Sequence, residues 1–237
     1  TDYIGNYMVT AGYLLAAALV MLTSAYMKRR FTNRALFSSA ALFFITGDII
    51  CDLAPTFWVL LLGRLIQAGC VGLCTPLMVN IILDVVPRSK LGMYIGFANL
   101  IILIAPAFGP TFGGFVVAVA SWRMIFWSTL PLALILLIIG QFVIKQYSPT
   151  QKYAFDWLRY FILGAALVAL IVGLNALSTA DYWECGILLA LCIGLTMLFV
   201  HLSKTATRHL FSLRVFADPA FLYSFLPYIL LQFANVG

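Results

Sequence analysis

Two ionisable side chains interrupt long apolar runs of the sequence. Asp48 lies six positions before Ala54, and Arg64 lies in the run that follows the Pro55–Thr56 turn. A charged group at the centre of a membrane helix costs about 2.5–3.5 kcal/mol on insertion scales, so it marks a candidate functional residue. With a rise of about 1.5 Å per residue, we expect both groups about 10 Å below one membrane surface, on adjacent antiparallel helices where they can face each other.

Two interpretations of Asp48 and Arg64 are open. In the first, they form a structural ion pair that makes each charge tolerable inside the membrane. In the second, Arg64 faces a transport cavity and tunes an acidic group that carries a proton. Gln67, one turn beyond Arg64, would then supply a neutral polar contact on the same helix face.

The sequence has few residues or motifs that could support catalysis or metal binding. It contains no G-x-S-x-G elbow, H-E-x-x-H pair or G-x4-G-K-[ST] loop. His201 and His209 stand near basic residues, where solvation explains them better than catalysis or ligation. The five cysteines lie in or beside apolar segments without C-x2-C spacing, which indicates packing residues. We expect no enzyme, no catalytic residue, no metal and no cofactor, and no ATP-driven pump in this segment.

The composition predicts a multi-span membrane protein. Of 237 residues, 64% are apolar and only 9% are charged, and the mean hydropathy is +1.05. About 20 apolar residues cross a bilayer, and several runs are that long. The net charge of +6 indicates membrane topology rather than nucleic-acid binding, because the basic residues fall in short loops.

Eight helices are expected from the apolar runs. Their approximate ranges are 7–26, 36–53, 57–83, 93–119, 124–144, 157–177, 183–202 and 221–237. Basic residues fill the odd-numbered loops, with Lys28, Arg29, Arg30 and Arg34 in the first, which places those loops in the cytoplasm. The chain opens at Thr1 without a signal peptide and stops inside an apolar run, so we expect a piece of a longer protein that lacks its first helix.

The fourth expected helix is rich in glycine and proline. Gly92 and Gly96 are four residues apart, and Gly109 and Gly113 repeat that spacing. Small residues at this interval let a neighbouring backbone approach closely. Pro106 and Pro110 each delete a helix hydrogen bond, so we expect a kinked helix that is packed in protein.

This stretch resembles the antiporter signature of the major facilitator superfamily. The pattern G-x8-A-x3-G-P-x2-G-G consists of Gly96, Ala105, Gly109, Pro110, Gly113 and Gly114, with Ala105 where the family usually has glycine. The segment LLGRLIQAGCVG resembles the family motif R-x-x-Q-G, whose arginine the family implicates in proton coupling. SWRMIFWSTLPLAL resembles W-R-x-x-F-x-x-N-x-P, with Thr129 in place of asparagine.

The resemblance also implies a cytoplasmic gate and a domain plan. The family loop places an acid where this chain has Lys28, and D-x-x-P-x-x-R-G is matched by Asp84 with Lys90 at the arginine position. The implied gate residues are Arg29, Arg30, Arg34, Asp84 and Lys90, and the missing acid leaves Lys90 without its usual partner. Two extra helices favour the fourteen-helix drug:proton antiporters. The implied domains are an amino-terminal bundle at 1–147, two linker helices at 148–204 and the start of a second bundle at 205–237.

The resemblance implies an all-α polytopic protein of the plasma membrane. It would export lipophilic, in particular cationic, drugs in exchange for protons, driven by the proton gradient and thus conferring antibiotic resistance. Its partners would be small lipophilic substrates, protons and the bilayer, with no nucleic acid. Two alternatives stay open: an exporter of an endogenous solute such as a lipid, siderophore or metabolite, and a membrane sensor or assembly protein that transports nothing.

Overall fold

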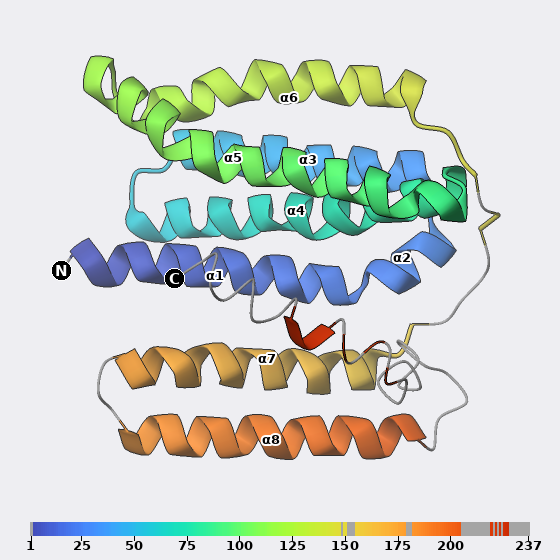
Figure 1. Ribbon diagram of the computed structural model, residues 1–237. Coiled ribbons are helices and arrows are strands. Elements are labelled where there is room, and N and C mark those ends of the chain that lie inside the picture. The colour runs from blue at the N-terminus through green and yellow to red at the C-terminus, as the bar shows by residue number, and fades with distance from the viewer. Residues whose placement is uncertain are drawn as a thin grey trace. The chain divides into compact units, whose positions relative to one another are not determined.

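The computed structural model describes residues 2–147, 149–150, 155–178 and 182–204, with 219, 221, 223 and 225–227. All regular structure in these residues is helical (Figure 1), which confirms the all-α fold. The helices are α1 (Asp2–Leu22), α2 (Ser24–Arg30), α3 (Asn33–Asp52), α4 (Phe57–Val85), α5 (Leu91–Val119), α6 (Arg123–Val143), α7 (Trp157–Ser178) and α8 (Tyr182–Lys204), with a 3₁₀ turn η1 at Arg88–Lys90.

Six of the described helices are long and apolar enough to cross a membrane. A seventh span is formed if α1 and α2, which meet at a bend of 46°, count as one. The predicted spans therefore correspond to helices from α1 to α8, and the first is divided at Thr23. The eighth predicted helix, 221–237, lies largely outside the described residues.

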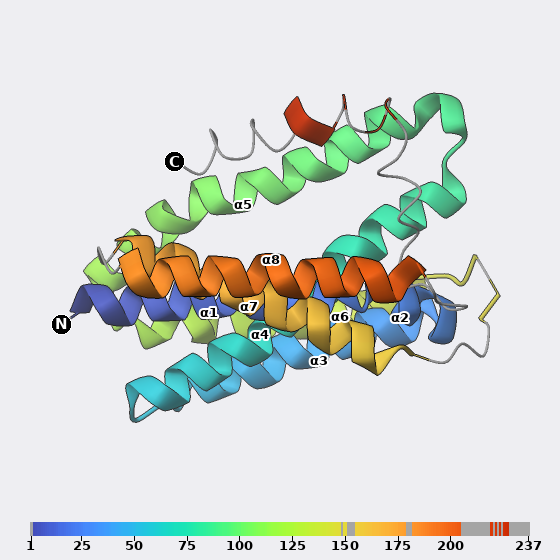
Figure 2. The same ribbon diagram turned by 90° about the horizontal axis from the view of Figure 1, so that it is seen from below.

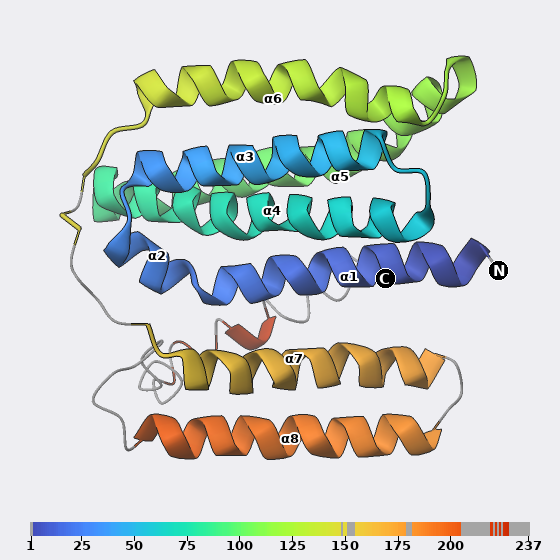
Figure 3. The same cartoon turned by 180° about the vertical axis from the view of Figure 1, so that it is seen from behind.

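The chain divides into two compact units, Thr1–Ala154 and Phe155–Gly237. In the first unit α4 is central, since it packs along both α1 and α3, and α6 packs on α3. Figure 3 shows α1, α4, α3 and α6 following one another across this unit. In the second unit α7 and α8 pack as a pair.

Glycines allow the close approach of α4 to its neighbours. A Cβ at Gly47 of α3 would lie 2.7 Å from the Gly63 carbonyl oxygen of α4. On the other side of α4, a Cβ at Gly72 would lie 2.8 Å from the Ala17 carbonyl oxygen of α1. Lipid supplies no hydrophobic drive between helices, so such close backbone packing contributes to the association of these helices.

Helix α5 behaves differently from the expectation of a packed helix. It runs continuously from Leu91 to Val119 through both prolines, and it diverges from the other helices of its unit (Figure 2). Ala98 is buried, but a Cβ at Gly92, Gly96, Gly109 or Gly114 would meet no atom within 4 Å. In the described part of the first unit the predicted close packing is therefore wrong at these four glycines, whereas Gly113 does approach α6.

Candidate functional site

The most buried charged side chain in the described residues is Asp48, which is 1% exposed. Its Oδ1 accepts a hydrogen bond of 2.9 Å from Nε2 of Gln67. Its Oδ2 accepts one of 2.8 Å from Oγ1 of Thr129. Three helices, α3, α4 and α6, thus meet at one carboxyl group, and both of its oxygen atoms are satisfied by neutral donors.

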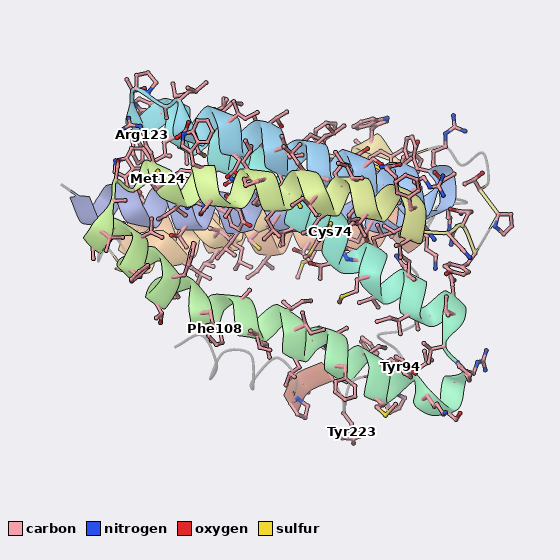
Figure 4. The ribbon with its side chains drawn as sticks, turned by 90° about the horizontal axis from the view of Figure 1, so that it is seen from above. Cys74, Tyr94, Phe108, Arg123, Met124 and Tyr223 are labelled. Atoms are coloured by element: carbon pink, nitrogen blue, oxygen red, sulfur yellow. The ribbon has the colours of Figure 1, made fainter. Side chains whose placement is uncertain are left out.

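Local packing explains why these side chains meet. The crossing of α3 and α4 at Gly47 and Gly63 brings the backbones together, and Gln67 follows Gly63 by one turn. Arg123, labelled at the start of α6 in Figure 4, fixes the third helix. Its Nε and Nη2 donate to the carbonyl oxygens of Asp52 and Ala54 at the end of α3, each at 3.2 Å.

Arg64 reaches Asp48 only through Gln67. Its Nη1 donates to Oε1 of Gln67 at 3.4 Å, and its guanidinium lies 5.4 Å from the ring centroid of Phe126. In the part of the chain that the structure describes, the ion pairs are Lys28–Asp84 and Asp156–Arg159, so a direct pair between Asp48 and Arg64 is wrong. Equal depth in the membrane does not fix the direction of a side chain around its helix, and Gln67 occupies the space between the two charges.

The arrangement lets Asp48 keep its hydrogen bonds in two protonation states. As a carboxylate it accepts from Gln67 and Thr129. As a carboxylic acid it can donate from Oδ2 to the Thr129 oxygen, because the Thr129 hydroxyl has other acceptors within reach: the carbonyl oxygens of Phe126 at 3.0 Å and Ile125 at 3.2 Å. A hydroxyl both donates and accepts, so its rotation accommodates either state.

Thr129 is the site residue that sequence reasoning did not select. It stands where the resembling family motif has asparagine, and this position in a polar motif was the available signal. A threonine in a membrane helix usually bonds to its own preceding turn, as Thr129 also does, and only the packing of α6 on α3 reveals its contact with Asp48.

The predicted gate residues lie at the opposite end of the first unit from Arg123. Nζ of Lys28 is 3.0 Å from Oδ1 of Asp84. Lys28 stands where the family has an acid, so this position supplies the cation of an ion pair instead of the anion. Nη2 of Arg34 donates to the Ile144 carbonyl oxygen at 3.5 Å. The remaining gate residues, Arg29, Arg30 and Lys90, are exposed.

Beside the gate residues, hydrogen bonds join the start of α3 to the segment after α6. Asn33 is buried, and its backbone N–H donates to Oε1 of Gln146 at 2.7 Å. Its Nδ2 donates to the Lys145 carbonyl oxygen at 3.2 Å. The first loop is thereby held to its own unit.

The signature residues Gly96, Ala105, Gly109, Pro110, Gly113 and Gly114 all lie on α5. Gly113 approaches α6, where a Cβ would lie 3.9 Å from Cδ1 of Ile125. Within the described residues, no hydrogen bond or ion pair joins α5 to the Asp48 cluster. The structure therefore does not bring the two predicted groups of residues together.

Comparison with known proteins finds one family and several related transporters. The family model of the Major Facilitator Superfamily matches residues 3–236. The lincomycin resistance protein LmrB of Bacillus subtilis is 34% identical over 218 residues, which cover 90% of this chain and 46% of that protein. The multidrug resistance protein B homolog of Mycobacterium tuberculosis (strain H37Rv) is 28% identical over 213 residues, covering 88% and 39%. The chain thus spans less than half the length of these relatives.

Proposed function

The chain belongs to the major facilitator superfamily, and from that membership we propose that it forms part of a proton-coupled antiporter that exports lipophilic, cationic compounds across the plasma membrane. In this proposal residues 1–147 are the amino-terminal bundle, 148–204 the two linker helices of a fourteen-helix transporter and 205–237 the start of the second bundle. The relatives named as lincomycin and multidrug resistance proteins support the drug class of the substrate.

The observation that carries the proposal is the burial of Asp48. A carboxyl group with 1% exposure in a helix that can span a membrane is energetically costly, and this cost marks Asp48 as a candidate functional residue. Its direct partners are two neutral groups, Gln67 and Thr129, and a carboxyl group so held can gain and lose a proton without breaking an ion pair. Arg64, one hydrogen bond further away, would stabilise the ionised state.

Alternating access would couple the protonation and deprotonation of Asp48 to transport. In transporters of this kind the two halves rock about a site near the middle of the membrane. A proton and a cationic substrate would compete for the ionised Asp48, so binding one excludes the other and each shifts the population of the inward and outward states. The signature residues of α5 would contribute to the coupling between the halves.

The test uses the full-length protein in proteoliposomes with a pH-sensitive dye, an imposed proton gradient and ethidium as the lipophilic cation. We expect ethidium to trigger proton release by the wild type. Asp48→Asn should abolish the release, because an amide cannot carry the proton. Arg64→Ala should abolish it as well, with the protein still inserted. Glu184→Gln, which changes an exposed carboxylate of α8, is the matched control and should release protons normally.

Retained proton release by the Asp48→Asn variant would overturn the role of Asp48, and retained release by Arg64→Ala would overturn the role of Arg64. If folded wild-type protein released no proton with a panel of lipophilic cations, an endogenous solute would become the better substrate. A non-transport role would require in addition that no solute moves at all.

A further inference from the structure

Two thiols lie side by side near the middle of α4. Sγ of Cys70 and Sγ of Cys74 are 4.0 Å apart, and both residues are free and half-buried. Their spacing of four residues places them on one face of the helix. Figure 4 labels Cys74 on α4, close to α6. The proposed transport cycle uses neither thiol.

Both thiols line a cavity of about 260 Å³ between α3, α4 and α6. Phe37 and Phe44 line it from α3, and Leu132 and Leu136 line it from α6. Thr129 is the one other polar residue in the lining, and its hydroxyl is already bonded to Asp48. The two thiols are therefore the groups in this lining that can coordinate a ligand.

We propose that Cys70 and Cys74 form a dithiol site for a soft divalent cation that prefers two ligands. Hg(II) is such a cation and serves as the probe. Thiolates select soft metals. Two metal–sulfur bonds of about 2.3 Å separate their sulfur atoms by about 3.8 Å at a tetrahedral angle and by about 4.6 Å on a line. The observed 4.0 Å is about 0.6 Å short of the linear value that a two-ligand cation takes, and side-chain rotation of the two cysteines can supply that difference.

Charge and coordination number narrow the class of cation. Two thiolates and one dication make a neutral complex, which an apolar cavity tolerates far better than a charged one. In the described residues no group of three or more metal-binding side chains exists, so cations that need four protein ligands are disfavoured. Hard cations such as Mg²⁺ and Ca²⁺ require oxygen ligands that this cavity lacks.

Binding is a substitution without redox change. Each S–H bond breaks as one sulfur–metal bond forms, and the two protons pass to water or buffer. One Hg(II) bound should therefore release two protons, as expected when a metal replaces the protons of its ligands. This stoichiometry distinguishes a shared dithiol from two separate thiols that each bind their own ion and release one proton.

The experiment titrates Hg(II) into the full-length protein in detergent. Retained metal is counted by mass spectrometry in the presence of excess glutathione. Proton release is followed in a separate titration without glutathione, in weak buffer with a pH dye. The wild type should retain one equivalent more than Cys70→Ser/Cys74→Ser and release two more protons. Each single variant should lose the same equivalent, because one thiol cannot outcompete a monothiol in excess. Cys192→Ser, at a half-buried lone thiol of α8, is the control and should retain it.

Equal retention by the double variant and the wild type would overturn the proposal, as would single variants that each still hold metal. If the serine variants do not elute as folded protein, thiol alkylation of the wild type decides. Hg(II) should then protect Cys70 and Cys74 together from a maleimide, and protection of only one of them, or of neither, would overturn the site. None of these readouts requires transport, so the result is independent of the proposed function.

Discussion

The Thr129 hydroxyl has one proton but three acceptors within 3.2 Å. When Asp48 is ionised, the proton points to Oδ2 at 2.8 Å. When Asp48 is protonated, the Thr129 proton can turn to the Phe126 carbonyl oxygen at 3.0 Å, which frees the hydroxyl oxygen to accept from Asp48. Thr129 thus adjusts to the charge of Asp48 without any movement of the helices.

Replacing Thr129 tests this adjustment. Thr129→Val keeps the shape but removes the hydroxyl, and an unpaired buried acceptor costs about 1–3 kcal/mol. We expect ethidium-dependent proton release in proteoliposomes to fall by about tenfold. Thr129→Ser keeps the hydroxyl and should retain most of the activity. A valine variant with wild-type release, or a serine variant as impaired as the valine variant, would contradict the role of the hydroxyl.

Asp48, Arg64 and Gln67 could be selected from sequence because polar groups are rare in apolar runs. The Asp48–Gln67 and Arg64–Gln67 contacts agree with the spacing on α4. The direct Asp48–Arg64 pair could not be judged from sequence, since spacing along antiparallel helices gives depth but not direction. The same holds for Cys70 and Cys74, whose four-residue spacing was visible but whose shared cavity depends on how α3 and α6 pack.

At the scale of the helix, glycines at the crossing of α3 and α4 position the site. A methyl group at Gly47 would lie 2.7 Å from the Gly63 carbonyl oxygen and 2.9 Å from the Gln67 backbone nitrogen. Because both atoms are backbone, neither helix can yield without moving apart from the other. The separation would also pull Gln67 away from Asp48.

Gly47→Ala should therefore destabilise the protein by about 1–3 kcal/mol, as overpacking does. Gly194→Ala in the interior of α8 is the matched control: no atom lies within 4 Å of its Cβ position, and alanine stabilises a helix interior relative to glycine by about 0.5–1 kcal/mol. Thermal unfolding of the detergent-solubilised full-length protein should show a lower Tm for the first variant and an unchanged or higher Tm for the second. Equal shifts would contradict the tight crossing.

Helix α5 allows a functional contact to be separated from a folding contact. A Cβ at Gly109 would meet no atom within 4 Å outside its own stretch of α5 in the described residues, so Gly109→Leu should leave the Tm nearly unchanged. If the antiporter signature couples the two halves, as we propose, the same variant should block or uncouple ethidium efflux, and so should Pro110→Leu. Wild-type efflux at normal expression would contradict the coupling role, and a large loss of Tm would show that Gly109 is needed for folding.

The sequence predicted the described spans to within a few residues, because long apolar runs leave little choice in a bilayer. The break at Thr23 was missed. There the Thr23 hydroxyl donates to the Val20 carbonyl oxygen at 2.7 Å, and apolar residues continue on both sides, so hydropathy shows no boundary. The packing partner of α5 could not be predicted either. A face of small residues indicates that another helix can approach closely, but it does not identify that helix.

At the scale of the whole protein, the end of the first unit that we predict to be cytoplasmic is tied together internally. Lys28 pairs with Asp84 of α4, Arg34 reaches the Ile144 carbonyl oxygen, and Asn33 bonds to Gln146. The family resemblance implies an acid in this loop that helps close the cytoplasmic side. Here the loop instead contributes a cation, Lys28, to a pair with Asp84 that links α2 to α4.

Charge reversal tests whether this pair matters for transport. The side chains of Lys28 and Asp84 are 25% and 16% exposed, and a partly exposed pair contributes only about 0–1 kcal/mol. We therefore expect Lys28→Asp and Asp84→Lys, which each place like charges together, to slow ethidium efflux by about two- to fivefold. The double variant restores an opposite pair and should recover the rate. If instead the double variant is as slow as the product of the two single effects, the residues act independently, and the family position of the acid rather than the pairing would govern the gate.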